Sequence, residues 1–96
     1  MARRLVITRR LVAPHALKRY DERWQELRGA AAGGPCHAWR YRSLAAPSSF
    51  VEFLEFGGSP DPRLEPAIAR AIQALEEVAA GSTEEWEDTT NPGGSE

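Results

Sequence analysis

Residues 36–56 read CHAWRYRSLAAPSSFVEFLEF, and this stretch contains two strand-like runs separated by a turn. Residues 36–44 alternate between two faces of a strand, one of which carries His37, Trp39 and Tyr41. Residues 50–56 form a second run that is rich in aromatic and apolar side chains. The segment AAPSS over residues 45–49 has the composition of a turn. The two runs are therefore predicted to form an antiparallel hairpin.

On the N-terminal side of this hairpin, residues 3–12 (RRLVITRRLV) are rich in β-branched side chains and predict a first strand. A helix is expected between this strand and the hairpin. Pro14 suits its first turn, and Gly33 and Gly34 suit its end. Apolar side chains recur along it every three or four residues, which indicates one buried face: Leu17, Tyr20, Trp24, Leu27 and Ala31.

On the C-terminal side, a second helix is predicted to begin near Asp61 or Glu65 and to end at a cap formed by Gly81. Its apolar stripe consists of Leu64, Ile68, Ile72, Leu75 and Val78. Residues 83–89 are a candidate short edge strand, and residues 91–96 are expected to be disordered. We therefore expect one domain over residues 1–81 and an acidic tail over residues 82–96.

The order of the predicted elements is β-α-β-β-α, with a candidate final strand. Right-handed crossovers fold this order into an α+β, ferredoxin-like antiparallel sheet with both helices on one face. The other face also carries large apolar side chains in every strand, whereas a solvated face would be polar. A second copy of the chain is the simplest cover for it, so we expect a homodimer.

Length and composition exclude several classes of protein. The 96 residues suffice for one domain, and a single cysteine, Cys36, excludes an internal disulfide and a multi-cysteine zinc site. The two histidines lie on different predicted elements, and their spacing is not that of metal ligands. No metal site is therefore expected. No run of 18 apolar residues occurs, so no membrane span is expected. The lone cysteine suits the cytoplasm.

Charge is divided unevenly along the chain. Residues 1–42 carry ten basic and three acidic side chains, whereas residues 43–96 carry two basic and eleven acidic ones. The opposite charges of the two halves either complement each other, within one fold or across a dimer, or the basic half forms a face that binds an anion or a nucleic acid. Residues 50–53 match the Phe-Val-x-Phe segment of the RNA-recognition motif. However, Glu52 and Glu55 would repel phosphate, and the first strand offers no aromatic ring to a base.

Two short motifs resemble a known family. Residues 34–39, GPCHAW, resemble the start of the second strand in antibiotic-biosynthesis-monooxygenase-like domains of the dimeric α/β-barrel superfamily, and residues 50–56 resemble the aromatic third strand of those domains. The likeness covers residues 3–80. It implies a domain that pairs with a second copy and binds a small aromatic or polyketide-like molecule between sheet and helices. Some relatives oxidise such a ligand without any cofactor, and we expect no cofactor here.

The candidate ligand-binding residues are His37, Trp39, Tyr41, Arg9 and Arg40. His37 titrates near neutrality and shares its strand face with two aromatic rings that could line a pocket. An arginine in a cavity would bind a carboxylate or enolate oxygen. Arg9, Arg40 and Arg42 could meet across the first two strands, which are expected to be adjacent. The alternatives are a partly exposed histidine and cross-strand ion pairs with Glu52 or Glu55. Cys36 is not expected to be a nucleophile, because it and His37 point to opposite faces.

The expected function is small-molecule binding, with monooxygenase-like oxidation as one form of it. A non-catalytic assembly or accessory module of the same fold is the alternative, and an RNA-binding module is a remote one. A cavity with His37, Trp39 or an arginine in its wall would favour the first interpretation. A cavity filled by side chains would favour the accessory module.

Overall fold

The computed structural model describes residues 2–34, 36–58 and 60–90. Four strands and two α-helices follow one another along the chain, and a short 3₁₀ turn precedes each helix (residues 14–16 and 62–64). In chain order the elements are β1 (Arg3–Leu11), α1 (Leu17–Ala32), β2 (Cys36–Arg42), β3 (Ser49–Gly57), α2 (Pro66–Val78) and β4 (Gly81–Glu87).

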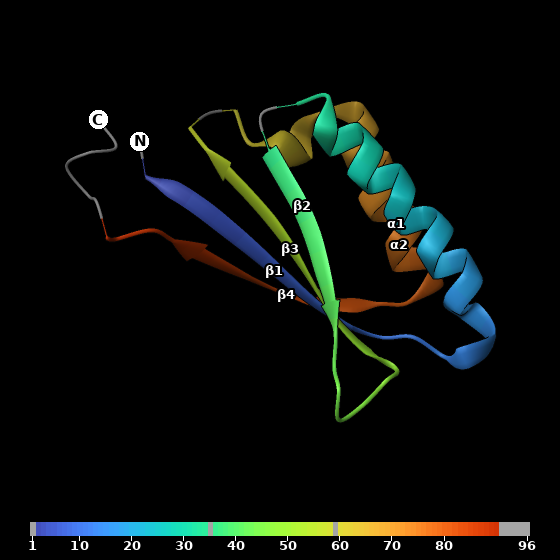
Figure 1. Cartoon of the computed structure of the whole chain (residues 1–96). Helices are drawn as coiled ribbons and strands as arrows, with labels where there is room; N and C mark the ends of the chain where they lie inside the picture. Colours follow the sequence, from blue (N-terminus) through green and yellow to red (C-terminus); the bar gives the residue numbers. More distant parts are fainter. Residues whose placement is uncertain (1, 35, 59, 91–96) are drawn as a thin grey trace.

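The strands form a single antiparallel sheet in the order β2-β3-β1-β4, and both helices pack on the same face of it (Figure 1). This is the ferredoxin-like arrangement that the sequence predicts, and β2 and β3 form the predicted hairpin. The assumption that β1 and β2 are neighbours is wrong, because β3 lies between them. Arginines on β1 and β2 therefore cannot meet as a cross-strand pair.

The buried stripe of α1 consists of Tyr20, Trp24, Leu27 and Ala31, as the spacing predicts. In α2 the buried residues are Ile68, Ala71 and Leu75. Leu64 was expected on this stripe, but it lies in the 3₁₀ turn before the helix and is 75% exposed.

The ends of α2 also differ from expectation. The side chain of Asp61 accepts a hydrogen bond from the backbone N–H of Arg63, so it caps the 3₁₀ turn, and Pro66 starts the helix itself. The helix ends at Val78, and Gly81 is the first residue of β4 instead of a helix cap. Gly81 is needed for another reason: a Cβ atom there would lie 2.6 Å from Cγ2 of Thr8.

The core lies between the helices and one face of the sheet. β3 alternates strictly, with Phe50, Glu52, Leu54 and Phe56 buried toward the helices. The other face of the sheet, which we call the open face, is covered by nothing within the described residues. It carries partly or fully exposed apolar side chains from all four strands: Leu5, Ile7, Trp39, Tyr41, Val51, Phe53 and Trp86.

The predicted edge strand near the C-terminal end is present as β4. Residues 81–87 pair with β1, two residues earlier at each end than the expected strand over residues 83–89. β4 thus extends the sheet beyond residue 81. The expected disorder of residues 91–96 lies outside the described residues. Neither described helix has the length and apolar character that crossing a membrane would require.

Candidate functional site

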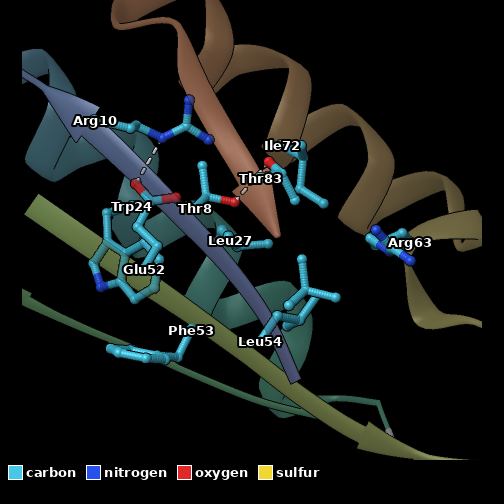
Figure 2. A pocket seen from close by; sticks show the side chains of 11 residues that line it. Thr8, Arg10, Trp24, Leu27, Glu52, Phe53, Leu54, Arg63, Ile72 and Thr83 are labelled. Carbon is cyan, nitrogen blue, oxygen red and sulfur yellow. Dashed lines mark hydrogen bonds and ion pairs between the residues drawn. The ribbon is translucent and has the colours of Figure 1, made fainter. Parts of the chain in front are cut away.

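A cavity of about 110 Å³ lies between the sheet and the two helices (Figure 2). Its helix side is apolar and includes Trp24, Leu27 and Ile72. Its sheet side carries the polar side chains of Thr8 and Arg10 on β1 and of Glu52 on β3. Apolar walls with a few convergent polar groups are the usual composition of a small-molecule site.

Arg10 and Glu52 form a buried ion pair in this wall. Their exposed fractions are 3% and 5%, and Nε of Arg10 donates to Oε2 of Glu52 over 2.9 Å. The hydroxyl of Tyr20 on α1 donates to the same oxygen over 2.7 Å. Oε2 of Glu52 on β3 therefore links this strand to β1 and to α1 at the cavity wall.

Arg10 also holds the end of α2. Its Nη1 donates to the backbone carbonyl oxygen of Ala79 over 2.7 Å and to the carboxylate of Glu76. The guanidinium lies so close to the start of β4 that a Cβ atom on Gly81 would be 2.9 Å from Nη1. A positive charge at the C-terminal end of a helix is favourable, because the last carbonyl groups carry partial negative charge.

The surroundings fix the protonation states of this cluster. Burial acts to lower the pKa of Arg10, but hydrogen bonds and charge from Glu52 and Glu76 outweigh it, so the pKa lies above its usual value. Burial raises the pKa of Tyr20, and the hydrogen bond to Glu52 and its charge raise that pKa further. At neutral pH, Arg10 is therefore charged, and Tyr20 is a protonated donor that cannot act as a base.

A second arginine closes the opposite end of the cavity (Figure 2). Arg63 donates to both carboxylate oxygens of Asp61, and to Glu85 on β4 over 3.1 Å. The hydrogen bond from Arg63 holds the pKa of Asp61 below its usual value. Because both ends of the cavity are tied to β4, the fourth strand is part of the site's framework.

The structure places four of the five expected site residues away from this cavity. His37, Trp39 and Tyr41 project from β2 onto the open face, and Arg9 projects there from β1, where it pairs with Glu84. Trp39 stacks on Phe53, with ring centroids 5.2 Å apart. A role of these residues in ligand binding stays a prediction, and it would concern the open face.

Arg40, the fifth expected residue, points to the helix side but lies outside the cavity wall. Its guanidinium carbon lies 5.0 Å from the ring centroid of Tyr20 and 5.5 Å from that of Trp24, and Nη2 donates to Asp21 over 2.7 Å. Such contacts of a cation with aromatic faces are stabilising. Arg40 thus packs over the edge of the core.

Arg10, Glu52 and Tyr20 were not among the expected site residues. The signal for Glu52 is present in the sequence, because it interrupts an otherwise apolar strand face, whereas Arg10 shares its face with Arg4 and Thr8. Charged residues are almost never fully buried unless they are paired. Cys36 is buried beneath α1, and burial raises its pKa, so its thiol stays protonated at neutral pH. Among the described residues, no three potential metal ligands of the His, Cys, Asp or Glu type gather in one place.

Comparison with protein-family models finds no match, and comparison with curated protein sequences finds none either. Solved structures do share the fold. A provisionally assigned antibiotic biosynthesis monooxygenase from Nitrosomonas europaea is similar with a TM-score of 0.76 at 10% identity, over 92% of this chain and 91% of that chain. Another from Bordetella bronchiseptica has a TM-score of 0.71 at 15% identity, over 93% and 99%.

SnoaB, a cofactor-independent oxygenase from Streptomyces nogalater, is similar with a TM-score of 0.71 at 9% identity, over 92% of this chain and 94% of that chain. The chain therefore has the fold of these solved structures, which is the fold that the resemblance seen in its sequence implies. At these identities the likeness establishes the fold and no particular activity.

Proposed function

We propose that this protein binds a small, mostly apolar molecule in the cavity between the sheet and the helices. The observation that carries the proposal is a cavity with an apolar helix side whose sheet side holds two charged side chains that are more than nine-tenths buried. Replacing a buried ion pair by apolar residues often leaves stability unchanged or improves it. The presence of Arg10 and Glu52 at the cavity wall is therefore better explained by binding than by stability alone.

The volume of the cavity limits the ligand. A cavity of roughly 150 Å³ holds one benzene molecule, and this one measures about 110 Å³. The part of the ligand that the cavity encloses is therefore expected to be no larger than a single ring. A polyketide with several fused rings would need the helices to move away from the sheet.

A homodimer is the second part of the proposal. The open face carries exposed aromatic rings, including Tyr41 at 64% and Trp86 at 56% exposure. Large apolar patches of this kind on a soluble domain mark interaction surfaces. A second copy supplies the same surface, so two sheets would bury their open faces against each other around a twofold axis.

Oxidation of the bound ligand is a candidate activity of the same cavity, favoured by the similarity to SnoaB. The wall offers Arg10 as a charged hydrogen-bond donor, whereas His37 and Cys36 lie outside it. Dioxygen would be the oxidant, so an oxygen electrode should record uptake when a ligand found by binding is added. A non-catalytic accessory module would bind the ligand without oxygen uptake, or would bind none.

Thermal unfolding with and without toluene tests binding in the cavity. Saturating toluene should raise the melting temperature of the wild-type protein, because a ligand that binds only the folded state stabilises it. Ile72→Phe fills the cavity from α2 and should abolish this rise. Leu64→Phe adds a similar ring at an exposed position and should keep it. An equal rise in all three proteins, or in none, would refute binding in this cavity.

A further inference from the structure

Two polar atoms in the cavity wall have no hydrogen-bond partner within residues 2–34, 36–58 and 60–90. They are Nη2 of Arg10 and Oε1 of Glu52: the bonds of Arg10 leave from Nε and Nη1, and both bonds to Glu52 arrive at Oε2. Neither of the two atoms is completely enclosed by protein. A donor and an acceptor on deeply buried side chains therefore remain available to a molecule in the cavity.

Both side chains reach the cavity from adjacent strands. Figure 2 shows the guanidinium of Arg10 above Thr8 and directed toward Thr83 and Ile72, with the carboxylate of Glu52 beside Thr8. The hydroxyl groups of Thr8 and Thr83 are 3.1 Å apart and bond to each other, so they already have a partner. The free donor and acceptor are thus the two wall atoms best placed to orient a ligand.

We propose that Nη2 of Arg10 and Oε1 of Glu52 bind one neutral group of the ligand that carries a hydrogen-bond acceptor next to a donor. A primary carboxamide and a hydroxyl beside a carbonyl are groups of this kind. A ligand that covers these two atoms takes them out of contact with water, so a ligand that bonds to both is favoured over one that leaves both unsatisfied. This inference rests on the proposed function, because it specifies the ligand of the same cavity.

Charge selects the neutral group over an ion. Arg10 already faces the carboxylates of Glu52 and Glu76, so a ligand carboxylate would bring a third negative charge to one guanidinium. A cationic ligand would instead lie against Arg10. Burying a charge without its own partner is costly in an apolar site. The apolar remainder of the ligand would pack against Trp24, Leu27 and Ile72.

Four probes of similar shape separate these possibilities: benzamide, benzoate, benzamidine and toluene. They place a neutral donor and acceptor, an anion, a cation and no polar group, respectively, on the same ring. Dissociation constants would be measured on the full ¹⁵N-labelled chain at pH 7 from the backbone amide shifts of Thr8 and Thr83. We expect benzamide to bind at least about tenfold more tightly than each of the other three, a difference of about 1.4 kcal/mol.

The outcomes distinguish the inference from the proposed function. If benzoate, benzamidine or toluene bound as tightly as benzamide, the donor and acceptor would not select the ligand, although cavity binding would stand. If no probe shifted Thr8 or Thr83 at millimolar concentration, the proposed function would fail and the inference with it. The four dissociation constants of the wild-type protein therefore test both the cavity binding and the selectivity.

A variant pair locates the selectivity. Glu52→Gln keeps the side-chain length and the acceptor for Arg10 and Tyr20 but removes a negative charge beside the guanidinium. The preference for benzamide over benzoate should then fall by about tenfold. Glu55→Gln makes the same change on the open face of the same strand and should leave the preference as it is in the wild type. An unchanged preference in folded Glu52→Gln would overturn the assignment to Glu52.

Discussion

Arg10 and Glu52 are diagonal neighbours on the helix-facing side of two adjacent strands. In the register of β1 and β3, Arg10 lies opposite Phe50 and Glu52 lies opposite Thr8. The two charged residues are therefore offset by two residues along the strands. This offset brings Nε of Arg10 within 2.9 Å of Glu52, while the rest of the guanidinium reaches the end of α2. Diagonal positions suit long side chains, which can span the greater separation between strands.

Removing the positive charge of this pair should destabilise the fold. Arg10→Met leaves Glu52 buried with the Tyr20 hydroxyl as its remaining protein donor, so the free energy of unfolding should fall by about 3–5 kcal/mol. Arg4→Met makes the same change at an exposed position of β1 and should cost less than about 0.5 kcal/mol. Urea denaturation of both variants measures the difference. Equal, small losses would show that the ion pair contributes little.

Tyr20 should make stability depend on alkaline pH. Its pKa is raised in the folded state above the ordinary value of 10.0. The folded protein therefore holds a proton that the unfolded chain releases, and this stabilisation is complete below pH 10 and lost as the pH rises above it. The slope attributable to Tyr20 should be about 1.4 kcal/mol per pH unit.

Tyr20→Phe removes the titrating group and serves as the comparison. Denaturation midpoints between pH 8 and 11 should fall more steeply for the wild type than for Tyr20→Phe. Parallel curves for the two proteins would mean that the hydroxyl of Tyr20 is not held by Glu52 in solution.

Gly81 should tolerate no side chain. Gly81→Ala places a methyl group 2.6 Å from Cγ2 of Thr8 and 2.9 Å from Nη1 of Arg10, so β4 or the Arg10 side chain must move. Overpacking of this kind should cost about 1–3 kcal/mol and weaken binding in the cavity. Gly29→Ala is the control, because a Cβ atom at Gly29 meets nothing within 4 Å. The idea fails if thermal unfolding ranks the two variants equally.

Most of the fold could be predicted because its signals are local. The strict alternation of residues 50–56 and the three-and-four spacing from Tyr20 to Ala31 each require only the geometry of one strand or one helix. Leu64 and Gly81 were misplaced because two different elements meet there. Leu64 belongs to a separate 3₁₀ turn, and the small residue at Gly81 serves contacts with Thr8 and Arg10 on another strand.

The site was less predictable because it depends on strand order. Glu52 is visible in the sequence as a charge on an apolar strand face, but it meets Arg10 only because β3 lies beside β1. The alternation of residues 36–44 pointed instead to the aromatic row of His37, Trp39 and Tyr41. That row faces away from the helices, because Cys36 and Ala38 occupy the helix-facing positions of β2.

The open face should bring two copies of the chain together. Interfaces that cover such a face are commonly above about 2,000 Å² in total and do not separate before unfolding. Light scattering at micromolar concentration should therefore give twice the chain mass, and dilution should lower the melting temperature. Phe53→Glu puts a charge among the rings of Trp39 and Tyr41 and should yield a single-chain mass. A wild-type monomer would contradict the dimer and leave the aromatic face free for single-stranded RNA.

Small molecules should bind between the sheet and the helices and not on the open face. The three tryptophans report on these two places separately, since Trp24 lines the cavity whereas Trp39 and Trp86 lie on the open face. The most direct measurement is a toluene titration of the ¹⁵N-labelled protein, followed through the indole N–H resonances. Binding in the cavity predicts a saturable shift of the Trp24 resonance while those of Trp39 and Trp86 stay in place. Saturable shifts of Trp39 or Trp86 with an unmoved Trp24 would contradict it.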